Sequence, residues 1–116
     1  MLYNELPVFK ASYDLILQVF KSSQTMKREY RYSLGEELKK EIVALIMCIY
    51  RANLTHDKEP HIMSARERIE TVKLQIRLLH DLKQIPLRNM AIITLQYETI
   101  SKQLAAWHKA MKNKKE

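Results

Sequence analysis

The feature that most constrains the fold is the near absence of residues that break helices. The chain of 116 residues contains one glycine and three prolines. Tight turns and strand connections draw heavily on these two residue types, so their scarcity argues against all-β and loop-rich folds and favours long helices. The length fits one domain with a single modest hydrophobic core.

Apolar residues recur at helical spacing in four segments of the chain. They predict helices over about residues 7–25, 34–52, 60–83 and 86–111, and a flexible basic tail at residues 112–116. The third and fourth segments carry apolar seams that step by three and four residues in alternation, which is the heptad pattern of packed helices. These seams are Ile62, Ala65, Ile69, Val72, Ile76 and Leu79, and Ile93, Tyr97, Ile100, Leu104, Trp107 and Met111.

Helix-end signals support these boundaries. Pro7 suits a first helical turn, where its missing N–H costs nothing. Ser33 and Glu36 match the capping-box pattern for the second helix. Ser64 with Glu67 could be another capping box, which would start the third helix later. The connections are short, so consecutive helices should be antiparallel neighbours, and we expect an all-α, up-down-up-down four-helix bundle.

Two of the predicted helices carry a second apolar stripe, well away from the core seam. The stripe residues are Val43, Met47, Tyr50 and Leu54 on the second helix, and Leu74, Leu78, Leu82 and Ile85 on the third. One interpretation is a wide internal core. The other is a subunit interface, since long exposed apolar patches mark association, and we expect a homo-oligomer through Val43, Met47, Tyr50, Leu74, Leu78 and Leu82.

Positive charge is concentrated in the last third of the chain. The net charge is +7, and residues 71–115 hold nine basic and two acidic residues, an excess of the same size. A one-sided basic surface favours a polyanion such as RNA or DNA, although it could equally be a solvated face that aids solubility. The candidate nucleic-acid-binding residues are Lys73, Arg77, Arg88, Lys109 and Lys112. Arg66 is expected to pair with Glu70 instead.

The segment Lys27-Arg28-Glu29-Tyr30-Arg31-Tyr32 alternates cations with aromatic residues. Such a pattern suits phosphate contact combined with base stacking. We favour a second interpretation, in which the tyrosines pack over the end of the bundle and the cations lie in water.

Catalytic and metal-binding patterns are not apparent. His56, Asp57 and His61 fall near a predicted loop, but their spacing is common by chance. We therefore expect no enzyme activity, no metal and no cofactor. The longest apolar run, residues 42–50, is too short to cross a bilayer, and the lone Cys48 lies inside it. These features, with the absence of a secretory signal, favour the cytoplasm and no membrane partner.

Several stretches resemble a known family. They are LPVFKASYDL (residues 6–15), YSLGEELKKE (32–41), IYRAN (49–53), ARERIE (65–70) and ISKQLAAW (100–107). They are similar to the accessory variability determinant (Avd) proteins of diversity-generating retroelements, and to the four-helix proteins encoded in 23S ribosomal RNA intervening sequences.

The resemblance implies a pentameric barrel of four-helix bundles with a basic surface. It implies a non-catalytic accessory protein that binds a reverse transcriptase and template RNA and supports mutagenic retrohoming. The alternative is a structural or protein-interaction bundle of the intervening-sequence type, without a specific nucleic-acid role.

Overall fold

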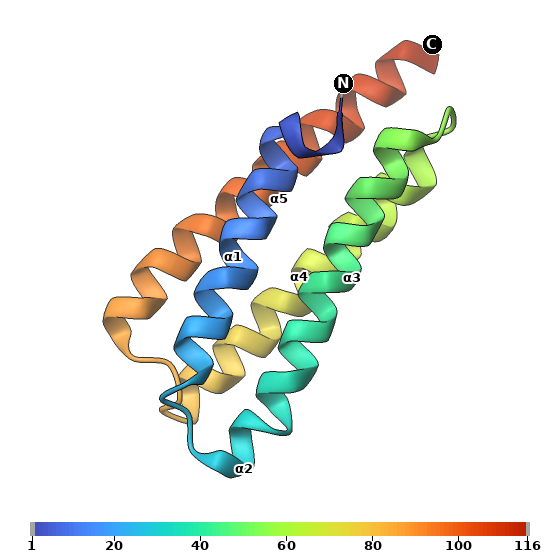
Figure 1. Cartoon of the computed structure of the whole chain (residues 1–116). Coiled ribbons are helices and arrows are strands. Elements are labelled where there is room, and N and C mark those ends of the chain that lie inside the picture. The colour runs from blue at the N-terminus through green and yellow to red at the C-terminus, as the bar shows by residue number, and fades with distance from the viewer. Residues whose placement is uncertain (1, 116) are drawn as a thin grey trace.

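The structure, a computed structural model, describes residues 2–115, and the regular elements in this range are all helical (Figure 1). A short 3-10 helix, η1 (Tyr3–Glu5), precedes α1 (Pro7–Ser23), and a four-residue helix, α2 (Arg28–Arg31), leads into α3 (Leu34–Leu54). The last two helices are α4 (Glu59–Asp81) and α5 (Leu87–Lys115). The four long helices run alternately up and down and form an elongated bundle of 49 × 21 × 21 Å (Figure 1).

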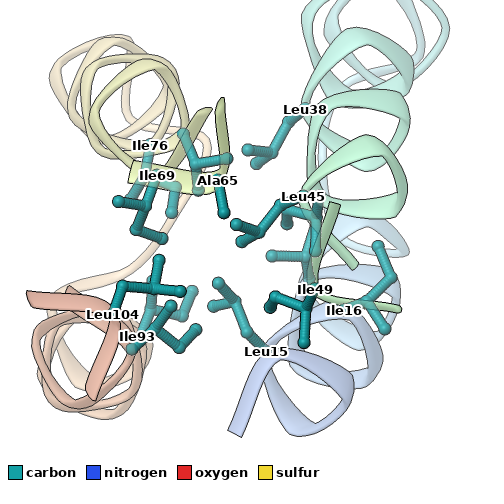
Figure 2. Packing of buried hydrophobic residues seen from close by; sticks show 14 of the residues in the cluster. Leu15, Ile16, Leu38, Leu45, Ile49, Ala65, Ile69, Ile76, Ile93 and Leu104 are labelled. Atoms are coloured by element: carbon teal, nitrogen blue, oxygen red, sulfur yellow. The ribbon is translucent and has the colours of Figure 1, made fainter. Parts of the chain in front are cut away.

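The bundle encloses one apolar core. α1 packs beside α3 and α5, and α4 packs beside the same two helices. All six seam residues of α4 are buried, as are Ile93, Ile100 and Leu104 of α5, so the heptad interpretation is confirmed for these helices. Figure 2 shows side chains from the four long helices meeting between the ribbons. Helical spacing also predicts Phe20 on the core-facing side of the first helix, but this side chain is half-exposed. Ile85 of the second stripe is buried in the core, as the wide-core interpretation expected.

The predicted helix ends are partly confirmed. Pro7 stands in the first turn of α1, and α3 begins after Ser33. The capping-box predictions were wrong, because the Ser33 hydroxyl donates to the Glu29 carbonyl instead, and Ser64 lies well inside α4. The basic tail was also wrong over residues 112–115, where α5 continues as helix. The remaining tail residue, Glu116, lies outside the described residues.

The only glycine allows α2 to pack closely against the start of α3. Gly35 is buried, and a Cβ atom built on it would lie 3.1 Å from the Tyr30 carbonyl oxygen and 3.3 Å from the Met26 sulfur. Such contacts are tighter than van der Waals packing normally allows. The sequence therefore uses glycine here for a close approach rather than for a turn.

The α4–α5 connection is a tight turn closed by backbone hydrogen bonds. Lys83 has a left-handed φ of 64°, its N–H donates to the His80 carbonyl, and the Gln84 N–H donates to the Leu79 carbonyl, both at 2.8 Å. This bond pair is the Schellman motif, which satisfies carbonyls at a helix C-terminus. His80 Nδ1 adds a bond of 2.8 Å to the Ile85 carbonyl, so its Nδ1 carries a proton, because a carbonyl can only accept.

Two side chains tie the α4–α5 turn and the start of α5 to the α1–α2 connection and the end of α1. Buried Gln84 accepts a 2.8 Å hydrogen bond from the Lys27 backbone N–H and donates to the Leu82 carbonyl. Asn89 donates to the Ser22 hydroxyl over 3.3 Å. The two connections therefore form one end of the bundle, where α2 and the α4–α5 turn lie close together (Figure 1). Within the described residues, no helix is both long and apolar enough to cross a bilayer.

Candidate partner-binding surfaces

The second stripe of α3 lies outside the core. Val43 is 49% exposed and Met47 is 39% exposed, whereas Tyr50 is half-buried. These residues do not extend the internal core, which was one of the two interpretations of the stripe. The Glu41 carboxylate bonds to Arg68 of α4 over 3.1 Å, which places that side of α3 against α4. At 100° per residue Val43 points 200° away from Glu41, so the stripe lies on the side of α3 that is nearer to α1.

The α3 stripe joins apolar residues of η1 and α1. The ring centroids of Tyr50 and Tyr3 are 4.9 Å apart, those of Tyr3 and Phe9 are 5.0 Å apart, and those of Phe9 and Tyr13 are 6.3 Å apart. At the other end of the same helix pair, the Lys39 ammonium lies 4.3 Å from the Phe20 ring. We define the α1/α3 apolar face as Tyr3, Phe9, Tyr13, Leu17, Phe20, Val43, Met47 and Tyr50.

Sequence reasoning missed the α1 half of this face. Tyr13, Leu17 and Phe20 are between 49% and 53% exposed. They step by four and three residues, so they form a second stripe of the same kind that α3 carries. That spacing was the signal that could have identified them.

A separate apolar strip lies on α4. Leu74 is 68% exposed and Leu78 is 44% exposed, while Leu82 is half-buried. The buried seam of α4, including Val72 and Ile76, faces the opposite direction. The polar groups of Glu41 and Arg68 lie between α3 and α4, so this strip is not continuous with the α1/α3 apolar face.

The hydrogen bond and the negative charge of Glu41 hold the pKa of Arg68 above its ordinary value.

Lys73, a candidate nucleic-acid contact, is held by protein groups. Its ammonium lies 3.3 Å from a Glu70 carboxylate oxygen and 3.6 Å from one of Glu98 on α5, and 5.6 Å from the Tyr97 ring. The side chain is only 22% exposed. The helix across from it, α5, therefore supplies a second carboxylate to this lysine.

The other basic candidates are exposed but do not converge. Arg77 is 81% exposed and 3.9 Å from Asp81. Arg88 lies at the start of α5, beside the α4–α5 turn. Lys109 and Lys112 lie near the other end of α5, which Figure 1 shows far from that turn. The structure therefore brings Arg77 closer to Arg88 than to the two lysines and does not gather the five candidates into one patch.

The aromatic and basic segment around α2 divides into anchored and open residues. The Arg31 guanidinium donates to the carbonyls of Ser23, Gln24 and Met26, at 3.1, 2.6 and 3.3 Å, and so caps the end of α1. Tyr30 packs against the core, as the packing interpretation expected. Tyr32, in contrast, is 63% exposed. The same short segment therefore both fastens the bundle end and presents an exposed aromatic ring.

Arg66 does not form the expected pair with Glu70. Its guanidinium donates to His108 Nδ1 over 2.7 Å, across from α4 to α5. Because guanidinium only donates, Nδ1 accepts and the ring proton is on Nε2, which lies 3.8 Å from a Glu59 oxygen. His108 is 4% exposed, so this contact joins the two helices deep in one end of the bundle.

The loop histidine region forms an open groove. His56, Asp57, Lys58 and Glu59 line it together with Met111 and Lys114. The Lys58 ammonium donates to the carbonyls of Ala52, Asn53 and Thr55 and caps the end of α3. Across the part of the chain that the structure describes, no three His, Cys, Asp or Glu side chains come together as a metal site would require.

Comparisons with known proteins identify a family. A family model described as bAvd-like matches residues 8–111, which extend from the first turn of α1 to near the end of α5. No curated protein matches the chain.

Proposed function

Because the chain belongs to the bAvd-like family, we propose that it is a non-catalytic accessory protein of a diversity-generating retroelement. In this role it binds the reverse transcriptase and the template RNA and supports mutagenic retrohoming. The observation that carries the proposal is the family match, because it spans the four long helices rather than one short motif.

The exposed apolar surfaces support an assembly of several chains. Half-exposed apolar side chains lie on the neighbouring helices α1 and α3, and exposed apolar patches in folded proteins mark association sites. We propose that α3 residues Val43, Met47 and Tyr50 lie in a subunit interface of a homo-oligomer, a pentamer in the Avd arrangement. Leu74, Leu78 and Leu82 would then serve a second contact, with a neighbouring subunit or with the reverse transcriptase.

The charge distribution supports contact with nucleic acid. The chain carries 20 basic and 13 acidic residues. Arg77, Arg88, Lys109 and Lys112 lie outside the core, spread along α4 and α5. A protein that binds RNA mainly through phosphates needs such a distributed basic surface rather than a pocket.

Co-purification with the partners tests this function. The tagged chain is co-expressed with the reverse transcriptase and template RNA of its own retroelement and washed at high salt. When all three are co-expressed, we expect the chain to retain both the reverse transcriptase and the RNA. When the RNA is expressed without the reverse transcriptase, we expect salt to release it, since phosphate contacts weaken as counterions compete. An unrelated basic four-helix bundle with the same tag is the control.

Failure to retain the reverse transcriptase would contradict the proposal. If such a chain still formed an oligomer, it would fit the alternative of a structural, protein-interaction bundle of the intervening-sequence type.

A further inference from the structure

An exposed aromatic ring with two guanidinium groups beside it stands at the α2 end of the bundle. The guanidinium carbon of Arg28 lies 5.9 Å from the centroid of the Tyr32 ring, and that of Arg31 lies 6.0 Å from it. Even with these neighbours the tyrosine is 63% exposed. The ring therefore keeps open area on which a second planar group could stack.

The ring is held by an anchored backbone. Arg31, the residue before Tyr32, is fixed by its three bonds to the end of α1. The Tyr32 N–H donates to the Arg28 carbonyl over 3.2 Å, and α3 begins two residues later at Leu34. Binding on this ring would thus order little more than the side chain itself, which lowers the entropic cost of binding.

The cations at this end are available. Lys27 and Arg28 are exposed, and in the described part of the chain neither side chain has a carboxylate partner. The bond between Gln84 and the Lys27 backbone brings the α4–α5 turn alongside, and with it exposed Lys83. Glu29 is the one acidic residue within residues 27–32. The local surplus of positive charge favours an anionic partner.

The combination of a free ring and unpaired cations favours one class of anion. An acidic peptide would satisfy the cations but leave the ring unused. A duplex presents phosphates, but its bases are already stacked on each other. A single-stranded polynucleotide supplies both an unpaired base, whose π face stacks on an aromatic side chain, and the adjacent phosphates. Arginine beside the ring adds cation–π attraction to such a stack.

We propose that Tyr32 and Arg28 form a stacking site for one unpaired base of a single-stranded polynucleotide, with Lys27 and Lys83 contacting the flanking phosphates. The inference rests on the nucleic-acid binding of the proposed function. It adds the location of the contact and the single-stranded class of ligand.

Binding of labelled oligonucleotides tests the site. Fluorescence anisotropy is measured with U20 RNA, dT20 DNA and a 20-base-pair duplex, for wild-type protein and for Tyr32→Leu and Tyr32→Phe. Leucine keeps apolar bulk without a π face, whereas phenylalanine keeps the ring. We expect Tyr32→Leu to weaken single-strand binding about fivefold or more, Tyr32→Phe to stay within about twofold, and duplex binding to stay unchanged.

Charge variants separate stacking from phosphate contact. Lys27→Gln should lower the slope of log affinity against log salt by about 0.7, the value for one phosphate contact on a single strand. Tyr32→Leu should leave that slope unchanged. If Tyr32→Leu loses affinity for U20 alone, the site is assigned to RNA, and if it loses affinity for dT20 alone, the site is assigned to DNA. A loss of affinity for both probes assigns the site to single strands of either kind.

Three outcomes would overturn the site. If Tyr32→Leu and wild type bind single strands with equal affinity, and binding still depends on salt, the stacking site is refuted and the proposed function is unaffected. No binding of wild-type protein to any of the three probes would remove the site together with the nucleic-acid part of that function. A lower native mass of Tyr32→Leu would show that the ring belongs to a subunit contact instead.

Discussion

At the scale of single residues, the tight end of α4 depends on a conformation that its residue disfavours. Lys83 adopts a φ of 64° so that the Schellman bonds can form. The left-handed region costs conformational free energy for an L-residue with a Cβ atom, and glycine is the residue most often found there. The structure keeps the lysine because neighbouring bonds of Gln84 and His80 hold the turn closed.

Lys83→Gly should therefore stabilise the protein. We expect the free energy of unfolding in urea to rise by about 0.5 to 1 kcal/mol, since the left-handed conformation costs an L-residue about 1 to 2 kcal/mol and glycine's freedom in the unfolded chain offsets part of the gain. The matched control is Lys102→Gly, at an exposed position inside α5, which should lower stability by about 1 kcal/mol. If both variants changed the free energy of unfolding in the same direction, the left-handed conformation of Lys83 would not be a source of strain.

At the scale of elements, the α1–α2 junction depends on one of two nearby arginines. Arg31 donates to three carbonyls at the end of α1, whereas Arg28, three residues earlier, lies beside the Tyr32 ring without a carboxylate partner in the described chain. Helix C-termini leave carbonyls that need such donors. The two arginines therefore have different roles although they share one short helix.

Arg31→Ala should destabilise the bundle and Arg28→Ala should not. We expect Arg31→Ala to lower the free energy of unfolding by about 1 to 2 kcal/mol, because hydrogen bonds from charged groups contribute more than neutral ones. Arg28→Ala should stay within about 0.5 kcal/mol of wild type, as exposed substitutions usually do. Urea unfolding followed by circular dichroism measures both, and equal losses would show that α2 is not fastened through Arg31.

Also at this scale, the contact between α4 and α5 changes what two neighbouring cations can do. Lys73 lies between carboxylates from both helices, while Arg77, one turn later, has one distant partner and is 81% exposed. Only the second is free to exchange its partner for a phosphate at low cost.

Under the proposed function, Arg77→Gln should weaken RNA binding more than Lys73→Gln. We expect Arg77→Gln to lower the salt slope by about 0.7 to 0.9, as the loss of one phosphate contact does, and Lys73→Gln to leave affinity within about twofold. Anisotropy titrations at several salt concentrations provide both quantities. A larger effect of Lys73→Gln would mean that its ion pairs open on binding.

At the scale of the whole molecule, the largest unexplained feature is the α1/α3 apolar face. The four helices already enclose a core, against which Phe9 of this face packs, whereas Tyr13, Leu17 and Phe20 are half-exposed. Its half-exposed residues come from two helices and η1, and an apolar surface that includes aromatic side chains suits a protein partner.

The α3 part of this face can be tested through the native mass. For wild-type protein we expect light scattering after gel filtration in high salt to give several times the 13.8 kDa chain mass, and about five times for a pentamer. Val43→Glu with Met47→Glu should give monomers, because buried carboxylates in an interface lose hydration without a partner.

The control for this experiment is Leu95→Glu, at a 71% exposed position on α5, which should leave the mass unchanged. Leu74→Glu with Leu78→Glu tests the α4 strip in the same way. Dissociation by this second pair alone would move the interface to α4, and monomeric wild-type protein would contradict an assembly through either surface.

The sequence by itself determined the four long helices and most of the core. Glycine and proline are scarce, so the helices are long, and the three-and-four spacing of Ile62 to Leu79 specifies which face is buried. These properties depend on neighbours in the same helix, which is why they can be read from spacing alone. Family resemblance likewise required only the sequence, and the bAvd-like match confirms it.

Only the tertiary structure decided what the polar and surface residues do. Arg66 bonds to His108 rather than Glu70, Lys73 is shared with Glu98, and Ser33 turns away from its expected capping role. Each of these outcomes depends on groups within hydrogen-bonding distance, and several of those groups come from another helix. Arg31 and Tyr32 are neighbours in one short segment, and only the hydrogen bonds of Arg31 to the end of α1 distinguish the anchored residue from the exposed one.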